Sequence, residues 1–208
     1  MFRAERLDRL IAGKLEADCR CATIGRQIIV LEQTGSTNDA ILQNATANSS
    51  EGLVLFAEHQ TAGRGQRGNR WESAAGKGLW FSILLRPKLQ INDSGRLTIW
   101  ALETISDVIQ TDFSLEPAIK LPNDLQLYSR KVAGVLVEMR AQEKAPHLAV
   151  VGIGVNVNQS LEDFPAELQS RAISLAIAMH RPVDRQKLAI AILQNLDRTY
   201  RARFAGNF

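Results

Sequence analysis

A short basic loop in the first half of the chain combines residue types suited to binding an anion. Residues 60–71 read Gln-Thr-Ala-Gly-Arg-Gly-Gln-Arg-Gly-Asn-Arg-Trp. Because glycine has no Cβ, backbone N–H groups here can approach a ligand closely, and inward-facing N–H groups form an anion-binding concavity. The arginines add bidentate contacts to phosphate or carboxylate. Taken alone, such a loop is more often a solvated surface loop or a nucleic-acid phosphate contact, and a small-molecule anion site is the alternative that the following segments favour.

Two lysines further along stand beside short apolar runs. Lys120 ends the run 118–120, and Leu121 precedes a proline, which favours extended geometry, so Lys120 is predicted to close a strand. Lys131 opens the run 132–138. A lysine held by rigid chain is a fixed point charge for a carboxylate or phosphate. For this stretch alone, two solvated lysines flanking an ordinary hairpin are the more common interpretation, and the glycines that follow favour a binding role instead.

Glycines interrupt the apolar segments that follow. Gly134 and then Gly152 and Gly154 lie among β-branched residues. A glycine inside such a strand marks a bulge or a close approach by another chain or ligand. The Gly-x-Gly is a poor dinucleotide fingerprint because Val157 replaces the third glycine and no helix signal follows, and the chain contains no P-loop motif.

Taken together, these motifs form a collinear series that resembles the catalytic domain of the biotin protein ligase family. The resemblance covers roughly residues 25–180 and rests on order and spacing, which is more specific than any one motif. The matching motifs are Ser36-Thr37-Asn38, 60–65, Trp71, Lys120 with Pro122-Asn123-Asp124, 131–138 and 152–158.

The resemblance implies ATP-dependent formation of biotinyl-5′-AMP, followed by transfer of biotin to a lysine of a carrier protein such as an acetyl-CoA carboxylase subunit. It assigns the catalytic roles to Lys131, Lys120 and Arg64. The residues implied to bind biotin are Ser36, Thr37, Asn38, Gln60, Arg64, Gly65, Gln66, Trp80, Lys131 and Gly134. Those implied to bind ATP with Mg²⁺ are Arg67, Trp71, Lys120, Asn123, Asp124 and Asn156, and no side-chain cluster for a metal is expected.

The chain departs from the family pattern at two residues and in the expected absence of a small C-terminal domain. Gln66 stands where the family often has arginine, which predicts weaker closure over the ligand, and Leu121 stands where it often has tryptophan. We expect residues 1–208 to form one catalytic domain, with a short N-terminal helix within residues 1–22. An N-terminal DNA-binding domain and the family's small C-terminal β-barrel domain are expected to be absent.

Composition is that of an ordinary globular protein. The 208 residues are 45% hydrophobic and 23% charged, with a net charge of +3. No stretch has the length of a membrane span and no signal-peptide core begins the chain, so a cytoplasmic location is expected, without nucleic-acid or membrane partners. A homodimer is compatible with the sequence. Cys19 and Cys21 are expected to be reduced and structural, because a disulfide between such near neighbours would be strained.

The elements that would position these residues follow from hydrophobic periodicity and capping signals. Helices are predicted over the first fifteen residues, from Ser36 or Thr37 (one of which would cap the helix) to Asn44, and over 99–109 and 185–203. Strands are predicted near 28–31, 53–57, 79–85, 117–120, 132–139 and 148–155, with hairpin connections at 126–131 and 141–147. This order indicates an α+β fold, a mixed sheet with helices mainly on one face. The family resemblance implies the same class, related to class II aminoacyl-tRNA synthetases.

Three other functions compete with biotin ligation. A lipoate–protein ligase would use the same chemistry, but the apolar dithiolane of lipoate needs fewer polar partners than Ser36, Thr37 and Gln60 provide. A nucleic-acid-binding module would use the 64–70 loop. The third is a remnant that binds biotin with weak ligase activity.

Overall fold

The computed structural model describes residues 8–44, 50–141 and 147–204. In this part of the chain seven strands form one sheet in the order β1-β2-β3-β7-β6-β5-β4. β1 and β2 are parallel and every other neighbouring pair is antiparallel, so the sheet is mixed, as predicted. The strands are β1 (Ile28–Thr34), β2 (Val54–Gln60), β3 (Gly78–Leu85), β4 (Ala118–Lys120), β5 (Asp124–Leu127), β6 (Arg130–Arg140) and β7 (Leu148–Asn156).

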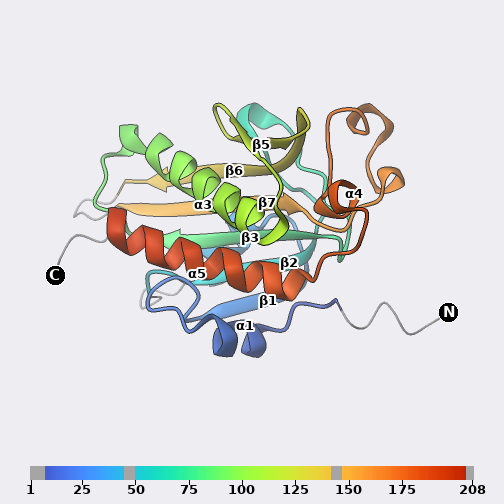
Figure 1. Ribbon diagram of the computed structural model, residues 1–208. Coiled ribbons are helices and arrows are strands. Elements are labelled where there is room, and N and C mark those ends of the chain that lie inside the picture. The colour runs from blue at the N-terminus through green and yellow to red at the C-terminus, as the bar shows by residue number, and fades with distance from the viewer. Residues whose placement is uncertain (1–7, 45–49, 142–146, 205–208) are drawn as a thin grey trace.

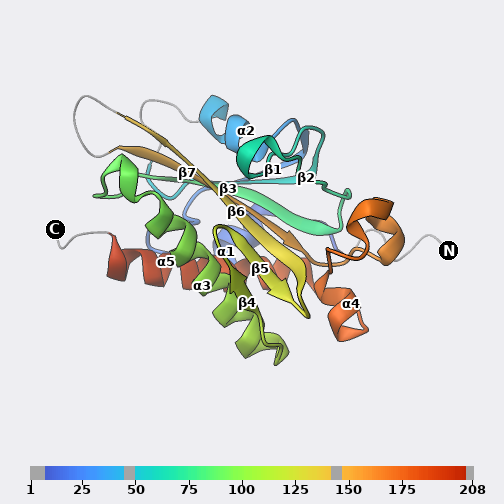
Figure 2. The same ribbon diagram turned by 90° about the horizontal axis from the view of Figure 1, so that it is seen from above.

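Helices cover the two faces of this sheet unequally. Figures 1 and 2 show α1, α3 and α5 on one face and α2 alone on the other. The α+β class with helices mainly on one face is therefore confirmed. The α-helices are α1 (Ala12–Cys19), α2 (Thr37–Asn44), α3 (Gly95–Phe113), α4 (Leu175–Met179) and α5 (Arg185–Arg203). Short 3₁₀ turns lie at Gln66–Gly68, Ile91–Asp93, Leu161–Asp163 and Ala166–Leu168.

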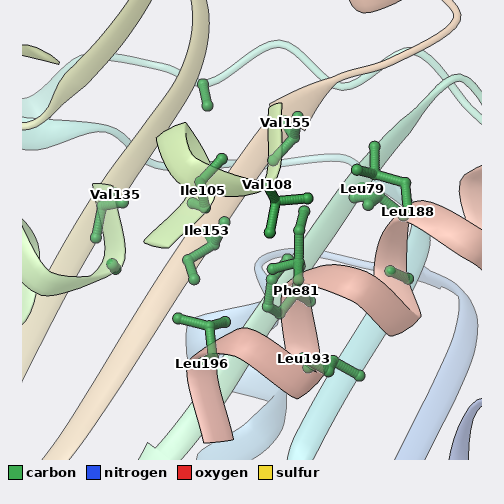
Figure 3. Packing of buried hydrophobic residues seen from close by; sticks show 14 of the residues in the cluster. Leu79, Phe81, Ile105, Val108, Val135, Ile153, Val155, Leu188, Leu193 and Leu196 are labelled. Carbon is green, nitrogen blue, oxygen red and sulfur yellow. The ribbon is translucent and has the colours of Figure 1, made fainter. Parts of the chain in front are cut away.

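The main core lies between the sheet and the layer of α3 and α5. All eight residues of β3 are buried, because the strand is central and both of its faces are covered. Leu79 and Phe81 point towards α5, where Leu188 and Leu193 meet them (Figure 3). A smaller cluster under α2, which includes Ile41, buries the opposite face of β2 and β3. The site-bearing strands are thus fixed from both sides.

The N-terminal helix lies later in the chain than predicted. It begins at Ala12, after an extended Ile11, and ends at Cys19. Residues 1–7 lie outside the described residues. Leu10 is buried in the main core although it precedes the helix, and its N–H group donates to Glu58 on β2. The apolar spacing therefore reflected burial of an extended segment as well as of a helix.

The predicted connection at 126–131 was wrong in its extent. Residues 124–127 form β5, and the turn is only Tyr128-Ser129, both at positive φ. Such two-residue turns usually carry Asn or Gly, so the pair gives no turn signal. The other connection predicted at 141–147 lies mostly outside the described residues, and α4 was not predicted.

The two cysteines are bonded to each other, which corrects the expectation that they are reduced. Their sulfur atoms lie 2.08 Å apart and their Cα atoms 5.3 Å apart. Arg20 between them has a left-handed conformation with φ 49°, so the chain turns sharply where α1 ends. That turn brings the Cα atoms within the usual disulfide range of roughly 4.4–6.8 Å.

Candidate active site

An open pocket, with about 430 Å³ of empty space including the solvent at its mouth, lies between the start of α2, the loop at 60–71 (the glycine-rich loop) and the middle of β6 and β7. Ten of the sequence-predicted site residues lie together here: Ser36, Thr37, Asn38, Gln60, Arg64, Gly65, Trp71, Asn123, Lys131 and Gly134. Val135, Leu136, Gly152, Ile153 and Gly154 complete the lining.

One side of the pocket is a set of neutral polar side chains, here called the polar wall: Ser36, Thr37, Asn38, Gln60 and Ser82. The backbone N–H and the hydroxyl of Thr37 both donate to Gln60 Oε1, at 2.8 and 3.1 Å. The Gln60 amide is thereby oriented with its NH₂ group left for another acceptor. Ser36 is buried, and its hydroxyl has no hydrogen-bond partner among the described residues. The polar wall thus offers neutral donors and acceptors to a ligand.

Ser82 is a member of this wall that sequence reasoning missed. It is fully buried on β3, and its hydroxyl lies 2.8 Å from Thr37 Oγ1 and 2.6 Å from Asn38 Oδ1. The available signal was one polar residue inside the apolar run 79–85. The sequence left two roles open for the hydroxyls of Ser36 and Thr37, helix capping and ligand binding, and the Thr37 hydroxyl contacts Gln60 and Ser82 of the polar wall.

The absence of side chains at three strand glycines leaves space for Asn38 and Trp71 to lie against the face of the sheet. A Cβ on Gly152 would lie 2.2 Å from Asn38 Oδ1. A Cβ on Gly154 or Gly134 would lie 2.5 or 2.8 Å from the Trp71 ring. Gly134 and Gly154 are paired across β6 and β7, so together they form a flat seat for the indole. This close approach agrees with the sequence interpretation of these glycines.

Lys131 is one of two cationic side chains in the pocket lining, with Arg64. Its Nζ lies 2.6 Å from Asp124 Oδ1 and 5.0 Å from the centre of the Trp71 ring. Its backbone is held too: the N–H group donates to Arg171 O at 2.7 Å, and the carbonyl accepts from Ile173 N–H at 2.9 Å. These contacts fix the position of the ammonium group. These two backbone contacts with Arg171 and Ile173, here called the clamp, were not predicted, because no local motif marks residues 171–173.

Lys120 differs from Lys131 in its surroundings. It ends β4, as predicted, but every residue of that edge strand is exposed, and Lys120 is not part of the pocket lining. No ion pair or hydrogen bond holds its side chain within the described part of the chain. The two lysines are thus distinguished by the fold, whereas their sequence contexts are similar.

The glycine-rich loop is closed on itself. Trp71 N–H donates to Gly63 O at 2.9 Å, and Gly65 N–H donates to Asn69 O at 2.7 Å. These two N–H groups are therefore not open to an anion, in contrast to the concavity expected from the sequence. Arg67 takes a left-handed conformation with φ 58° and is exposed.

Arg64 in this loop is held by two carboxylates. Its guanidinium donates to both oxygens of Asp39 on α2, and its Nη2 lies 3.2 Å from Glu138 Oε2 on β6. The hydrogen bond from Arg64 lowers the pKa of the Asp39 carboxyl, and the same bond raises the pKa of Arg64. Glu138 belonged to a matched motif but was assigned no role, although it is the one charged residue in the run 132–139.

Six predicted site residues lie outside the pocket lining: Gln66, Arg67, Trp80, Lys120, Asp124 and Asn156. Trp80 is fully buried and meets the Trp71 ring edge-on, with centroids 5.9 Å apart. Asp124 acts through Lys131, and Asn156 Nδ2 donates to the Lys131 carbonyl at 3.2 Å. Within the pocket, Asn123 joins β5 to β6, since its Nδ2 donates to Val135 O at 3.0 Å.

Comparisons with known proteins agree with this geometry. A profile of the Biotin/lipoate A/B protein ligase family matches residues 30–156. The bifunctional ligase/repressor BirA of Bacillus spizizenii is 33% identical over 193 residues, which cover 93% of this chain and 59% of that protein. The biotin–[acetyl-CoA-carboxylase] ligase of Mycobacterium tuberculosis is 34% identical over 200 residues, covering 91% of this chain and 72% of that protein. The chain belongs to the biotin/lipoate A/B protein ligase family.

Solved structures support this membership. A biotin protein ligase from Aquifex aeolicus, in complex with biotin and ATP, matches with a TM-score of 0.72 and 30% identity, over 86% of this chain and 73% of that chain. The resemblance of the motif series to biotin protein ligases is therefore confirmed. The chain spans 59% of the length of its Bacillus relatives, so it corresponds to part of those proteins.

Among the described residues there is neither a membrane-spanning helix nor a metal-binding cluster. None of their helices combines the length and apolar character needed to cross a bilayer. Within the same residues, no group of three or more His, Cys, Asp or Glu side chains is arranged to hold a metal ion.

Proposed function

We propose that this chain carries the catalytic site of a biotin–protein ligase. The observation that carries the proposal is one pocket in which the neutral polar wall faces a fixed cation, Lys131. Biotin has the complementary chemistry, a neutral cyclic urea at one end and a carboxylate at the other. The related Aquifex ligase, whose structure contains biotin and ATP, supports the same assignment.

The proposed reaction has two steps. A biotin carboxylate oxygen attacks the α-phosphorus of ATP, forming an O–P bond and breaking the bond to the β-phosphate, so that pyrophosphate leaves. A carrier lysine amine, after losing its proton, then attacks the acyl carbon. A C–N bond forms and AMP leaves. Both partners of the first step are anions, so catalysis requires positioning and charge neutralisation rather than a protein nucleophile.

The residues divide this work by position. Gln60 and Ser36 would bind the ureido head with the free groups of the polar wall. Lys131 would neutralise charge between the carboxylate and the α-phosphate, and its clamp keeps it oriented before the reaction. Trp71, seated on Gly134 and Gly154, would form an apolar wall between head and nucleotide.

We propose that Mg²⁺ enters with ATP and is bound chiefly by the phosphates. Mg²⁺ retains several waters and uses one or two carboxylates with substrate phosphates. The described residues fit that mode, since they contain no acidic cluster while Asp124 adjoins Lys131 at the pocket. The metal would supply further charge neutralisation. Lys120, Arg67 and Asn156 remain proposed nucleotide contacts.

The acceptor is proposed to be a biotin carrier domain such as that of acetyl-CoA carboxylase, the substrate named for the Mycobacterium relative. The same chemistry with lipoate is less well matched, because an apolar dithiolane leaves the buried hydroxyl and amide groups of the polar wall unpaired. A DNA-binding role would require a broad basic face, whereas Arg64 is neutralised by Asp39 and Glu138.

The proposal is tested by ATP–pyrophosphate exchange with the purified chain, run in parallel with biotin and with lipoate. We expect exchange with biotin, and streptavidin-detectable labelling of an added carrier domain. Exchange with lipoate but not with biotin would contradict the assignment. Biotin binding without exchange would instead identify a binding remnant.

A further inference from the structure

A continuous set of polar contacts links the polar wall to the glycine-rich loop. Asn38 Nδ2 donates to Glu138 Oε2 at 2.6 Å, while Asn38 Oδ1 lies 2.6 Å from the Ser82 hydroxyl. The same Glu138 oxygen lies 3.2 Å from Arg64 Nη2. Glu138 is therefore shared between a buried member of the wall and an arginine of the loop.

The contacts close into a ring because Asn38 and Asp39 are neighbours on α2. Asn38 contacts Glu138, Glu138 contacts Arg64, and Arg64 contacts Asp39. Three elements are joined in this way: α2, β6 and the loop. With two carboxylates against one guanidinium, the charge of Arg64 is already neutralised. Arg64 thus fastens the loop to α2 and β6, and Lys131 is the cation presented to the substrate.

Asn38 has little freedom within this ring. It is buried, and the absence of a side chain at Gly152 allows its amide to lie against β7. Both polar atoms of the amide are engaged, by Ser82 and Glu138. A ligand that shifts the Asn38 amide therefore also shifts the Glu138 carboxylate, and a shift of Glu138 alters its contact with Arg64.

We propose that Glu138 is a positioning residue that couples occupation of the polar wall by the ureido head to closure of the glycine-rich loop. The inference rests on the proposed function, because it takes biotin as the ligand. In this proposal Asn38 and Glu138 transmit the effect of ligand binding to Arg64. Asp39 is a second anchor of Arg64 and contacts only the loop. By reciprocity, a closed loop also holds Asn38 in the geometry that binds the head group.

Trypsin provides a direct readout, since the loop contains Arg67 and Arg70, both exposed. The rate of cleavage at these two sites follows the population of the open loop when opening is fast relative to cleavage. The experiment measures that rate in the full chain with and without biotin and without ATP, in parallel with calorimetric biotin affinity. The matched control is Glu103→Gln, which removes an exposed carboxylate that pairs with Arg203, away from the loop and its cleavage sites.

In the native chain, biotin slows cleavage. Glu138→Gln retains an acceptor for Asn38 but loses the charge that attracts Arg64, so cleavage without ligand becomes faster. The protection factor given by biotin then falls about fivefold or more, the lower end of typical coupling between sites. Asp39→Asn also speeds cleavage but retains most of the biotin-dependent protection. Glu103→Gln should behave as the native chain.

The opposite results separate the two hypotheses. If biotin protects the native loop and Glu138→Gln retains the same protection factor and affinity, the role of Glu138 is overturned while the proposed function stands. If calorimetry detects no biotin binding to the native chain, the proposed function fails and the coupling with it. Arg64→Gln breaks the same contact from the exposed side, so it replaces Glu138→Gln if that variant does not fold, and unchanged protection in it overturns the proposal.

Discussion

Single residues with the same chemistry have different surroundings in this fold, and Lys131 and Lys120 show the difference. Lys131 is fixed at both its backbone and its ammonium group, by Arg171, Ile173 and Asp124. Lys120 lies on an exposed edge strand. A fixed charge is already oriented when negative charge develops in the transition state, whereas a solvated lysine must first be ordered.

We predict that Lys131→Ala lowers the rate of single-turnover adenylation by about 10²–10³, the usual cost of losing one preorganised electrostatic contact. Biotin affinity should change much less, because the polar wall remains intact. Lys120→Ala is the matched variant and should have a smaller effect. Quenched-flow measurement of biotinyl-AMP tests the comparison, and an unchanged rate in Lys131→Ala would show that this lysine only begins a strand.

At the scale of elements, the glycine-rich loop owes its position to contacts at its two ends. Trp71 is seated on Gly134 and Gly154 at one end, and Arg64 is anchored on α2 and β6 at the other. Between them, Gln66 is neutral and lies outside the pocket lining. Gln66 itself therefore contributes no charge to retention of an anionic adenylate.

We predict that Gln66→Arg slows release of biotinyl-AMP, since an added cation near the site strengthens electrostatic closure over the adenylate. Release is measured by diluting a preformed complex and quenching at intervals. Thr61→Arg adds the same charge at an exposed position at the start of the loop and serves as the control. Release that is equally fast or faster from Gln66→Arg would show that this position does not control retention.

At the scale of the whole molecule, one buried arginine joins segments distant in the chain. Arg185, at the start of α5, is 1% exposed, and its Nη1 donates to Glu58 Oε2 at 2.8 Å and to Gly78 O at 2.9 Å. Its Nε also donates to Asp8 at 3.2 Å. Glu58 lies on β2 two residues before Gln60, so this ionic cluster supports the strand that carries part of the polar wall.

We predict that Arg185→Leu lowers the free energy of unfolding by about 3–5 kcal/mol, because it leaves Glu58 buried without a counter-charge. Urea denaturation followed by circular dichroism measures the change. Lys187→Ala, two residues away, removes a lysine side chain that is 84% exposed, and its effect should lie near zero. A loss below 1 kcal/mol in Arg185→Leu would mean that Glu58 finds solvent or another partner.

The sequence by itself determined the features that depend on local pattern. Helical spacing and an N-terminal Asp184 predicted α5 at its observed bounds. The pattern also predicted the mixed sheet, the strand that ends at Lys120 and the close approach at the strand glycines. The motif series also identified ten residues that line one pocket.

Only the tertiary structure decided which partners those residues take. Arg64 was expected to bind the substrate anion, yet its carboxylates lie 25 and 74 residues away in the chain. Ser82 completes the polar wall from a strand 44 residues beyond Asn38, and residues 171–173 clamp Lys131 from a segment without a motif. These contacts depend on strand order and register, which bring distant residues together and leave no local trace in the sequence.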